Sequence, residues 1–129
     1  MKADVYSHGR SERIIGKALK KYNIPRDRVV ILSKCYFGVD ETGGNRPIQA
    51  VNSNDGDMVN RVGLSRKHIM DAVEKSVQRL DTYIDVLQIH RLDRVTPREE
   101  IMKALNDVVE SGKVRYIGAS SVCDLSAAS

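Results

Sequence analysis

The sequence of 129 residues is long enough for one modest domain, and its content of 41% hydrophobic and 29% charged residues excludes a chain that is disordered throughout. The 21 Lys and Arg residues outnumber the 17 Asp and Glu residues, and the resulting net charge of +4 is scattered along the chain. Because aromatic residues make up only 5%, this pattern argues against a nucleic-acid partner. No apolar run reaches about 18 residues and no signal-peptide pattern is present, so we expect no membrane partner and a cytoplasmic location.

The two cysteines, Cys35 and Cys123, lie far apart in the sequence. Neither belongs to a CxxC or Cys/His pattern with the spacing of metal ligands. We therefore predict free thiols in a reducing compartment and no metal site.

The first predicted elements alternate between strand and helix. Residues 3–6 are typical of the end of a strand whose beginning lies outside the chain. Apolar residues recur at helical spacing over about 11–21 and continue to Tyr22, which predicts a helix with this stripe buried. Pro25 ends that helix, because it lacks a backbone donor and favours an extended residue before it.

A nearly uninterrupted apolar run at 29–32 predicts the next strand, and Lys34 stands at its carboxyl end. A run with no polar face is typical of a parallel strand that is covered on both sides. Ligands bind at the carboxyl ends of parallel strands, so Lys34 is a candidate site residue. The alternative, a lysine that merely reaches solvent after a buried strand, stays open at this point.

A long polar loop is predicted at about 36–63, with Gly43-Gly44, Pro47 and a stretch rich in Asn, Asp and Gly at 52–57. Loops of this length are uncommon in compact domains, and both a flap over a site and a tolerated insertion remain open interpretations. The loop is not a phosphate loop of the GxxxxGK[ST] type, because that pattern is absent.

Two further helix and strand pairs follow the loop. Ser65 is the expected N-cap of a helix that runs to about Leu80, and an apolar strand at 83–89 ends at His90. We expect these elements to continue the alternation of strands and helices.

The start of the last helix is predicted from the residues at its N-terminus. Thr96 is the expected N-cap, Pro97 the first helical residue, and Glu99 the partner that closes a capping box. Gly112 is a plausible C-cap glycine, and the strand at 114–119 follows it.

This alternation predicts an α/β fold with a parallel sheet. Parallel strands bring their carboxyl ends to one edge, so one site could hold the residues that follow the strands: Tyr6, Lys34, His90, Ser120 and Ser121. Taken singly, each has a commonplace alternative, such as a boundary tyrosine or histidine or a serine turn. Their joint placement at successive strand ends favours a shared site.

A tyrosine, a lysine and a histidine in one site suit carbonyl reduction. Tyr6 could donate a proton to the carbonyl oxygen, and the Lys34 ammonium would lower the phenol pKa from about 10. His90 could orient the carbonyl through an imidazole N–H. The hydroxyls of Ser120 and Ser121 could hold a carboxamide such as that of nicotinamide.

Several stretches together resemble the aldo-keto reductases, most closely their fungal aryl-alcohol-dehydrogenase-like branch. These stretches are 4–9, 11–19, 30–34, 83–91 and 112–121. The resemblance implies a (β/α)8 TIM barrel, of which residues 1–129 would form a partial domain with roughly strands two to five and their helices.

The same resemblance implies an activity and a set of roles. The family carries out NADPH-dependent reduction of aldehydes and ketones, or oxidation of alcohols, so NADP(H) and a small carbonyl or alcohol substrate are the expected ligands. Tyr6 matches the family's proton donor, Lys34 the lysine that tunes it, and His90 the orienting histidine. Ser120 and Ser121 match the pair that holds the nicotinamide carboxamide.

The sequence departs from the family pattern in two ways. The aspartate expected five residues before the tyrosine is replaced by Met1, which removes the expected ion-pair partner of Lys34. A full barrel also needs about 250 residues, so we expect a truncated barrel with two open parallel edges.

A truncated barrel is expected to aggregate or to form a homo-oligomer through its open edges, and to show little or no turnover alone. The alternative function is therefore an inactive remnant or an interaction module. An unrelated flavodoxin-like phosphate binder is a poorer alternative, since only the α/β rhythm supports it.

Overall fold

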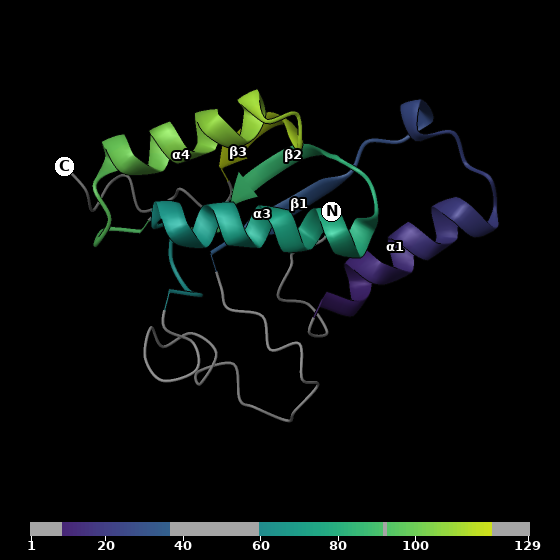
Figure 1. Cartoon of the computed structure of the whole chain (residues 1–129), viewed down its shortest axis with the longest axis horizontal. Helices are drawn as coiled ribbons and strands as arrows, with labels where there is room; N and C mark the ends of the chain where they lie inside the picture. The colour runs from purple at the N-terminus through teal and green to yellow at the C-terminus, as the bar shows by residue number, and fades with distance from the viewer. Residues whose placement is uncertain (1–8, 37–59, 92, 120–129) are drawn as a thin grey trace.

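Helices and strands alternate through the residues that the computed structural model describes, which are 9–36, 60–91 and 93–119 (Figure 1). All three strands of the sheet are parallel, in the order β1-β2-β3. The strand end expected at 3–6 and most of the loop expected at 36–63 lie outside the described residues. In chain order the elements are α1 (Arg10–Lys21), the 3-10 turn η2 (Arg26–Arg28), β1 (Leu32–Cys35), α3 (Arg66–Leu80), β2 (Ile84–Ile89), α4 (Arg98–Glu110) and β3 (Val114–Ala119).

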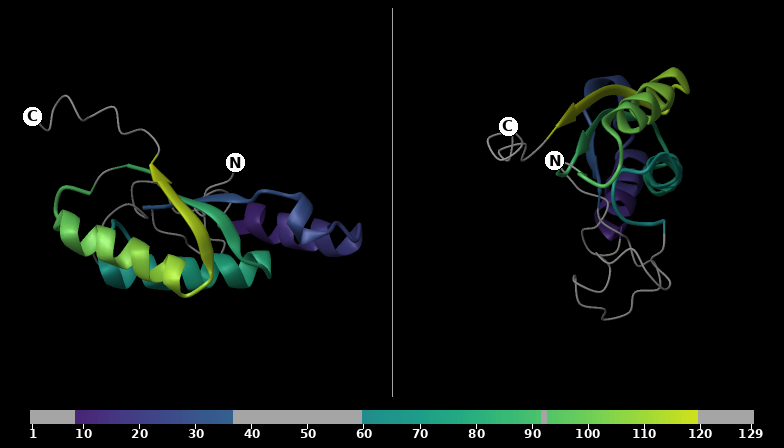
Figure 2. Two further views of the ribbon diagram at one scale, coloured as in Figure 1. Left: turned by 90° about the horizontal axis from the view of Figure 1, so that it is seen from above. Right: turned by 90° about the vertical axis from the view of Figure 1, so that its left-hand side faces the viewer.

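The three α-helices lie on one side of the sheet, as Figure 2 shows from two directions. Most of the apolar core is packed between the sheet and these helices. Its largest fully buried apolar side chains are Leu64, Ile69, Val73, Leu80, Ile84, Leu87, Val108 and Val114. The parallel α/β arrangement confirms the predicted fold class.

The first strand is shorter than predicted, because side chains occupy the backbone groups before it. The Arg26 guanidinium donates to the Val29 carbonyl over 2.9 Å, and the Ile31 N–H donates to the Asp85 carboxylate over 2.7 Å. Val30 is 69% exposed, so the expectation of a strand covered on both sides was wrong for this part of the run. In the part of the chain that the structure describes, helices cover only one face of the sheet.

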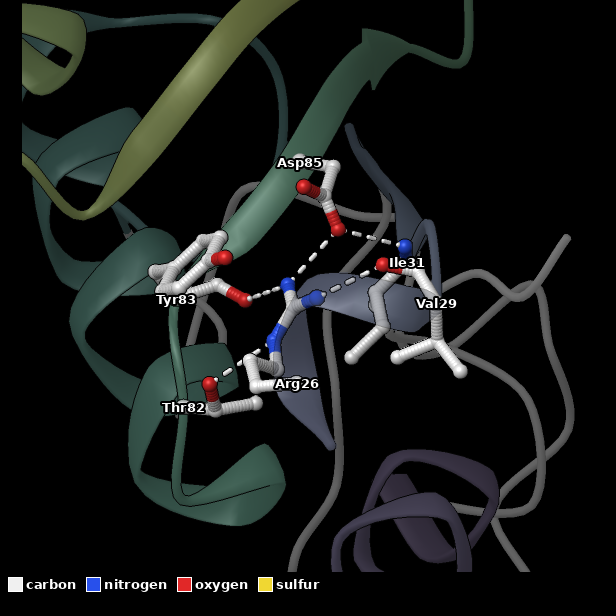
Figure 3. Close-up of polar contacts among 6 residues, drawn as sticks. All are labelled: Arg26, Val29, Ile31, Thr82, Tyr83 and Asp85. Carbon is white, nitrogen blue, oxygen red and sulfur yellow. Dashed lines mark hydrogen bonds and ion pairs between the residues drawn. The ribbon is translucent and has the colours of Figure 1, made fainter. Parts of the chain in front are cut away.

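The amino ends of β1 and β2 are held together by the Arg26 side chain (Figure 3). Its guanidinium lies 3.9 Å from the centre of the Tyr83 ring and pairs with Asp85 at 2.7 Å. All three of its nitrogens donate hydrogen bonds, to acceptors on Thr82, Val29, Tyr83 and Asp85. This end of a parallel barrel sheet serves stability rather than ligand binding.

Helix α1 buries a charge together with part of the predicted apolar stripe, since Ile15 and Leu19 are half-buried against the core. Its buried residues are Glu12 and Gly16, whereas Ile14 is 65% exposed and Tyr22 is 67% exposed. A Cβ on Gly16 would lie 2.5 Å from the Leu80 carbonyl oxygen, so α1 crosses the end of α3 at very close range. The helix and part of its packed face were predicted correctly, whereas the burial of Glu12 and the exposure of Ile14 and Tyr22 were not.

The buried charge of α1 belongs to a network that links three elements. The Glu12 carboxylate accepts a 2.6 Å hydrogen bond from the Ser33 hydroxyl of β1. Its other oxygen pairs with the Arg79 guanidinium of α3 at 2.7 Å, and Arg79 also donates to the Ser76 hydroxyl. The side chains of Glu12 and Arg79 are only 1% and 5% exposed, so this is a buried ion pair.

The predicted helix caps had mixed outcomes. Ser65 is the N-cap of α3, as predicted, and its hydroxyl accepts a hydrogen bond from the His68 N–H. The predicted capping box of α4 was wrong: Pro97 occupies the N-cap position, and the Thr96 hydroxyl donates to Asp93 instead. Thr96 stands one position before the N-cap, and its hydroxyl is directed to the buried Asp93 carboxylate, a strong acceptor.

Gly112 follows the last residues of α4 with φ of 82°, a left-handed conformation that favours glycine. Its N–H donates to the Val109 carbonyl, and Ser111 occupies the C-cap position. The glycine therefore ends the helix as predicted, one residue beyond the cap itself.

The chain leaves β1 and returns to α3 at neighbouring positions. The Gly63 N–H donates to the Tyr36 carbonyl over 2.7 Å, and the Leu64 N–H donates to the Asp93 carboxylate over 2.8 Å. Burial raises the pKa of Asp93, but hydrogen bonds from Leu64, Thr96 and nearby backbone outweigh it and lower the pKa below its ordinary value. A charged Asp93 therefore ties the returning chain to the residues after β2.

Removing either partner of the Glu12 and Arg79 pair leaves a buried charge uncompensated. We expect Glu12→Gln or Arg79→Met to lower the free energy of unfolding by about 3–5 kcal/mol, measured by urea denaturation with circular dichroism. Combining Glu12→Gln with Arg79→Met should cost less than the sum of the two single changes, because neither charge is then left without its partner.

The matched control is Asp81→Asn, which removes the exposed ion pair that Asp81 makes with Lys20. Asp81 has φ of 56°, a conformation that asparagine also tolerates. This substitution should change the free energy of unfolding by no more than about 0.5 kcal/mol. Equal losses in the buried-pair variants and this control would contradict a special role for the buried pair.

Candidate active site

Lys34 lies on the face of the sheet opposite the helices. Its neighbours in β1, Ser33 and Cys35, are both buried, and the Ser33 hydroxyl donates to Glu12 on the helical side. Successive side chains of a strand point to opposite faces, so Lys34 projects away from the helices. The network around Glu12 thereby also determines on which side Lys34 emerges.

His90 directly follows β2 and lies beside the end of β1. Its backbone N–H donates to the Cys35 carbonyl over 3.0 Å. Lys34 is paired in register with Gln88, which precedes His90 by two positions and shares its face. The structure therefore brings together the Lys34 and His90 side chains, as expected for neighbouring strand ends.

The surroundings of His90 favour its neutral form. Burial lowers the pKa of His90 below its ordinary value of 6.5, and the nearby positive charges of Lys34 and Arg91 lower it further. A neutral imidazole keeps one N–H as a donor without adding a second positive charge beside Lys34. This is the state that could orient a carbonyl oxygen.

The other described histidine is not a candidate for this site. His68 lies in α3, is 5% exposed, and has a pKa that burial lowers to about 4. It is therefore a neutral residue of the core.

Gln88 was missed by the sequence analysis, although it shares a face with Lys34 and His90. Its side-chain oxygen Oε1 is buried and has no hydrogen-bond partner within the described residues. The signal was present in the sequence, since Gln88 is a polar residue inside an otherwise apolar stretch of the strand.

Tyr6, Ser120 and Ser121 lie outside the described residues, so their places in the site and the roles of all five candidates stay predictions. In the described part of the chain, no group of three or more possible ligands could hold a metal ion. In the same ranges, no helix is long and apolar enough to cross a membrane.

A groove of about 350 Å³ between α1 and α3 involves none of the candidate residues. It is lined mainly by basic side chains, including Arg13, Lys17, Lys20, Lys75 and Arg79. The groove lies between helices on the outer side of the sheet, so we do not assign the carbonyl chemistry to it.

A parallel sheet with helices on one face, and with a lysine and a histidine at neighbouring strand ends, defines a portion of a β/α barrel enzyme fold. A family model described as "Aldo/keto reductase family" matches residues 2–126. The chain thus belongs to the aldo/keto reductase family, which confirms the resemblance found in the sequence.

Among curated relatives, the chain is 74% identical over 121 residues to the versiconal hemiacetal acetate reductase of Aspergillus parasiticus. It is 60% identical over 121 residues to a putative aryl-alcohol dehydrogenase of Saccharomyces cerevisiae. Each match covers 93% of this chain and 35% of the relative. The chain therefore spans about a third of the length of these relatives.

A solved aldo-keto reductase from Bacillus halodurans, in its holo form, superposes with a TM-score of 0.73 at 29% identity. This match covers 94% of the present chain and 35% of that structure. The likeness confirms that the fold is part of an aldo-keto reductase barrel.

The electrostatic link between Lys34 and His90 can be tested by titration. Lys34→Met removes a positive charge beside the imidazole, so the pKa of His90 should rise toward its ordinary value. The measurement is an NMR titration of the histidine ring carbons between about pH 4 and pH 8. Lys17→Met, which removes an exposed lysine from α1, is the control and should leave the His90 pKa unchanged. A His90 pKa that is the same in wild type and Lys34→Met would contradict the proximity of the two side chains.

Proposed function

We propose that the chain carries the proton-donating part of an NADP(H)-dependent carbonyl reductase site. The observation that supports this best is the meeting of Lys34 and a neutral His90 at the carboxyl ends of adjacent parallel strands. These ends form the catalytic face of β/α barrels.

Each residue has a distinct role in this proposal. Tyr6 donates the proton to the carbonyl oxygen, and the Lys34 ammonium lowers the phenol pKa so that this transfer proceeds near neutral pH. His90 donates a hydrogen bond from its neutral imidazole to the same oxygen and stabilises the negative charge that develops there. Oxidation of an alcohol would use these groups in the reverse direction.

The described strand ends are compatible with a phosphate-bearing cofactor. Their charged or polar groups include the cations of Lys34 and Arg91 and a neutral donor at His90. The Asp93 carboxylate, nearby in sequence, accepts hydrogen bonds from Leu64 and Thr96. Ser120 and Ser121 would hold the nicotinamide carboxamide by their hydroxyls. Bound NADPH would supply the hydride for the reduction.

The proposed substrates are small aldehydes and ketones, or the corresponding alcohols. Relatives are described as a hemiacetal acetate reductase and a putative aryl-alcohol dehydrogenase, and this supports an aromatic carbonyl as the first substrate to try. We propose the cytoplasm as the location, where a reducing environment would keep the buried Cys35 as a free thiol.

The test uses the purified full chain, NADPH and an aromatic aldehyde. We expect the folded chain to bind NADPH, as seen by fluorescence, and to oxidise it slowly in the presence of the aldehyde. Tyr6→Phe, Lys34→Met and His90→Phe should each lower the rate roughly 100-fold while NADPH binding is retained.

The control for this experiment is again Lys17→Met, which should keep the wild-type rate. A folded chain that binds no NADPH would refute the proposal. So would turnover that is equally fast in wild type and in Lys34→Met, because that activity would come from another site or another protein.

A second candidate function, an interaction module, is supported by the open face and edges of the sheet. Within the described residues, β1 and β3 each have a strand neighbour on one side only. Val30, two residues before β1, and Tyr116 of β3 are 69% and 71% exposed, which is unusual for apolar and aromatic residues at a parallel sheet.

Light scattering after size-exclusion chromatography tests this second function. We expect the chain to form a homodimer or larger oligomer that Tyr116→Ser weakens, because the aromatic ring would be buried at the contact. Met102→Ser, on the exposed side of α4, is the control and should leave the association unchanged. A wild-type chain that is a stable monomer at all concentrations would exclude self-association.

A further inference from the structure

The amide oxygen of Gln88 is a buried acceptor without a donor among the described residues. An unsatisfied buried acceptor costs about 1–3 kcal/mol, so such groups have a partner in the working protein. Gln88 lies in the middle of the sheet face that carries Lys34 and His90. The identity of its donor therefore bears on the candidate site.

The neighbours on the β3 side offer no donor. Gly118 is paired in register with Gln88, and a Cβ on Gly118 would lie 3.5 Å from the Gln88 Cγ atom. Glycine has no side chain to donate, and its lack of one leaves the room that the Gln88 side chain occupies. Val86, two positions earlier on the same face, is apolar.

The neighbour on the β1 side is Lys34, the register partner of Gln88. Adjacent strands lie about 4.8 Å apart, so the flexible four-carbon stem of lysine can bring its ammonium to the amide oxygen. The ammonium has three donors, and within the described ranges Lys34 makes no ion pair with a carboxylate. Among the residues that the structure describes, an acceptor without a donor and a cation without an ion-pair partner therefore lie on neighbouring strands.

We propose that Gln88 is the positioning residue of Lys34: its Oε1 accepts a hydrogen bond from the ammonium and holds it at the strand ends beside His90. An amide fixes the position of the lysine without neutralising its charge, so the full positive charge still acts on a nearby phenol and on the imidazole. The use of Lys34 in proton transfer rests on the proposed function, but the hydrogen bond itself does not.

The test measures the pKa of Lys34 in the full chain by competitive acetylation at a series of pH values, with the labelled peptide quantified by mass spectrometry. In Gln88→Met the ammonium loses an acceptor, so its pKa should fall by about one unit, and labelling below that pKa should be roughly tenfold faster. In Gln88→Glu the acceptor becomes a carboxylate, so the pKa should rise and labelling should slow.

The opposite directions of these two pKa changes distinguish a positioning role from a merely structural one. A merely structural role would shift the Lys34 pKa in the same direction in both variants. Gln78, an exposed glutamine of α3, provides the matched controls Gln78→Met and Gln78→Glu, which should leave Lys34 labelling unchanged. Circular dichroism verifies that each variant is folded. If Gln88→Glu fails to fold, Gln88→Asp replaces it: its carboxylate should also raise the Lys34 pKa and slow labelling, the opposite of Gln88→Met.

Unchanged Lys34 labelling in folded Gln88→Met would overturn the proposal and assign the donor to another residue or to a ligand. The result is separable from the carbonyl reductase function, because labelling needs neither cofactor nor turnover. Where turnover is measurable, Gln88→Met should also shift the pH dependence of the rate, whereas Gln78→Met should not. A chain without turnover that still shows the opposite labelling shifts would refute the function and leave the hydrogen bond intact.

Discussion

The buried ion pair between Glu12 and Arg79 is the constraint on which the arrangement of this sheet and its first helices depends. Taking two charges out of water costs several kcal/mol per ion unless their remaining hydrogen-bonding capacity is satisfied. Here the hydroxyls of Ser33 and Ser76 supply further hydrogen bonds to the two charged groups. Because the four residues come from three elements, α1, β1 and α3 satisfy these charges only when all three are in place.

The ion pair also affects the candidate site, because successive side chains of a strand point to opposite faces of the sheet. Ser33 is held on the helical side by its bond to Glu12, and the next residue must therefore point the other way. That residue is Lys34, and its register with Gln88 brings it beside the end of β2. The buried Glu12 carboxylate on one side of the sheet therefore determines that the Lys34 side chain projects from the other side.

Much of the fold could be predicted from the sequence because its signals are local. Helical and strand periods located the described elements to within about three residues, and Ser65 caps its helix as expected. The errors arose where a distant partner decided the outcome. Thr96 bonds Asp93 rather than its own helix, and α1 buries Glu12 because Arg79, far along the chain, stands opposite.

The candidate site was likewise predicted where local signals sufficed and missed where distant partners decide. Strand ends could be recognised from apolar runs, so the proximity of Lys34 and His90 followed from the parallel topology. Gln88 was overlooked because its importance depends on register, which places Lys34 on one side of it and a glycine on the other. The register between two strands is set by how they pack, so it cannot be predicted from the sequence of either strand alone.

The closure at Tyr36, Gly63 and Asp93 has a consequence for how such a chain can diversify. Two hydrogen bonds hold the points of departure and return of the segment between Tyr36 and Gly63, so its two described ends are anchored to the residues around β1 and β2. Each doubling of a loop's length adds only about 0.6 kcal/mol of closure entropy. A change in the number of residues between these anchors would therefore cost little closure entropy, and the hydrogen bonds that place Ser33 and Lys34 would not depend on it.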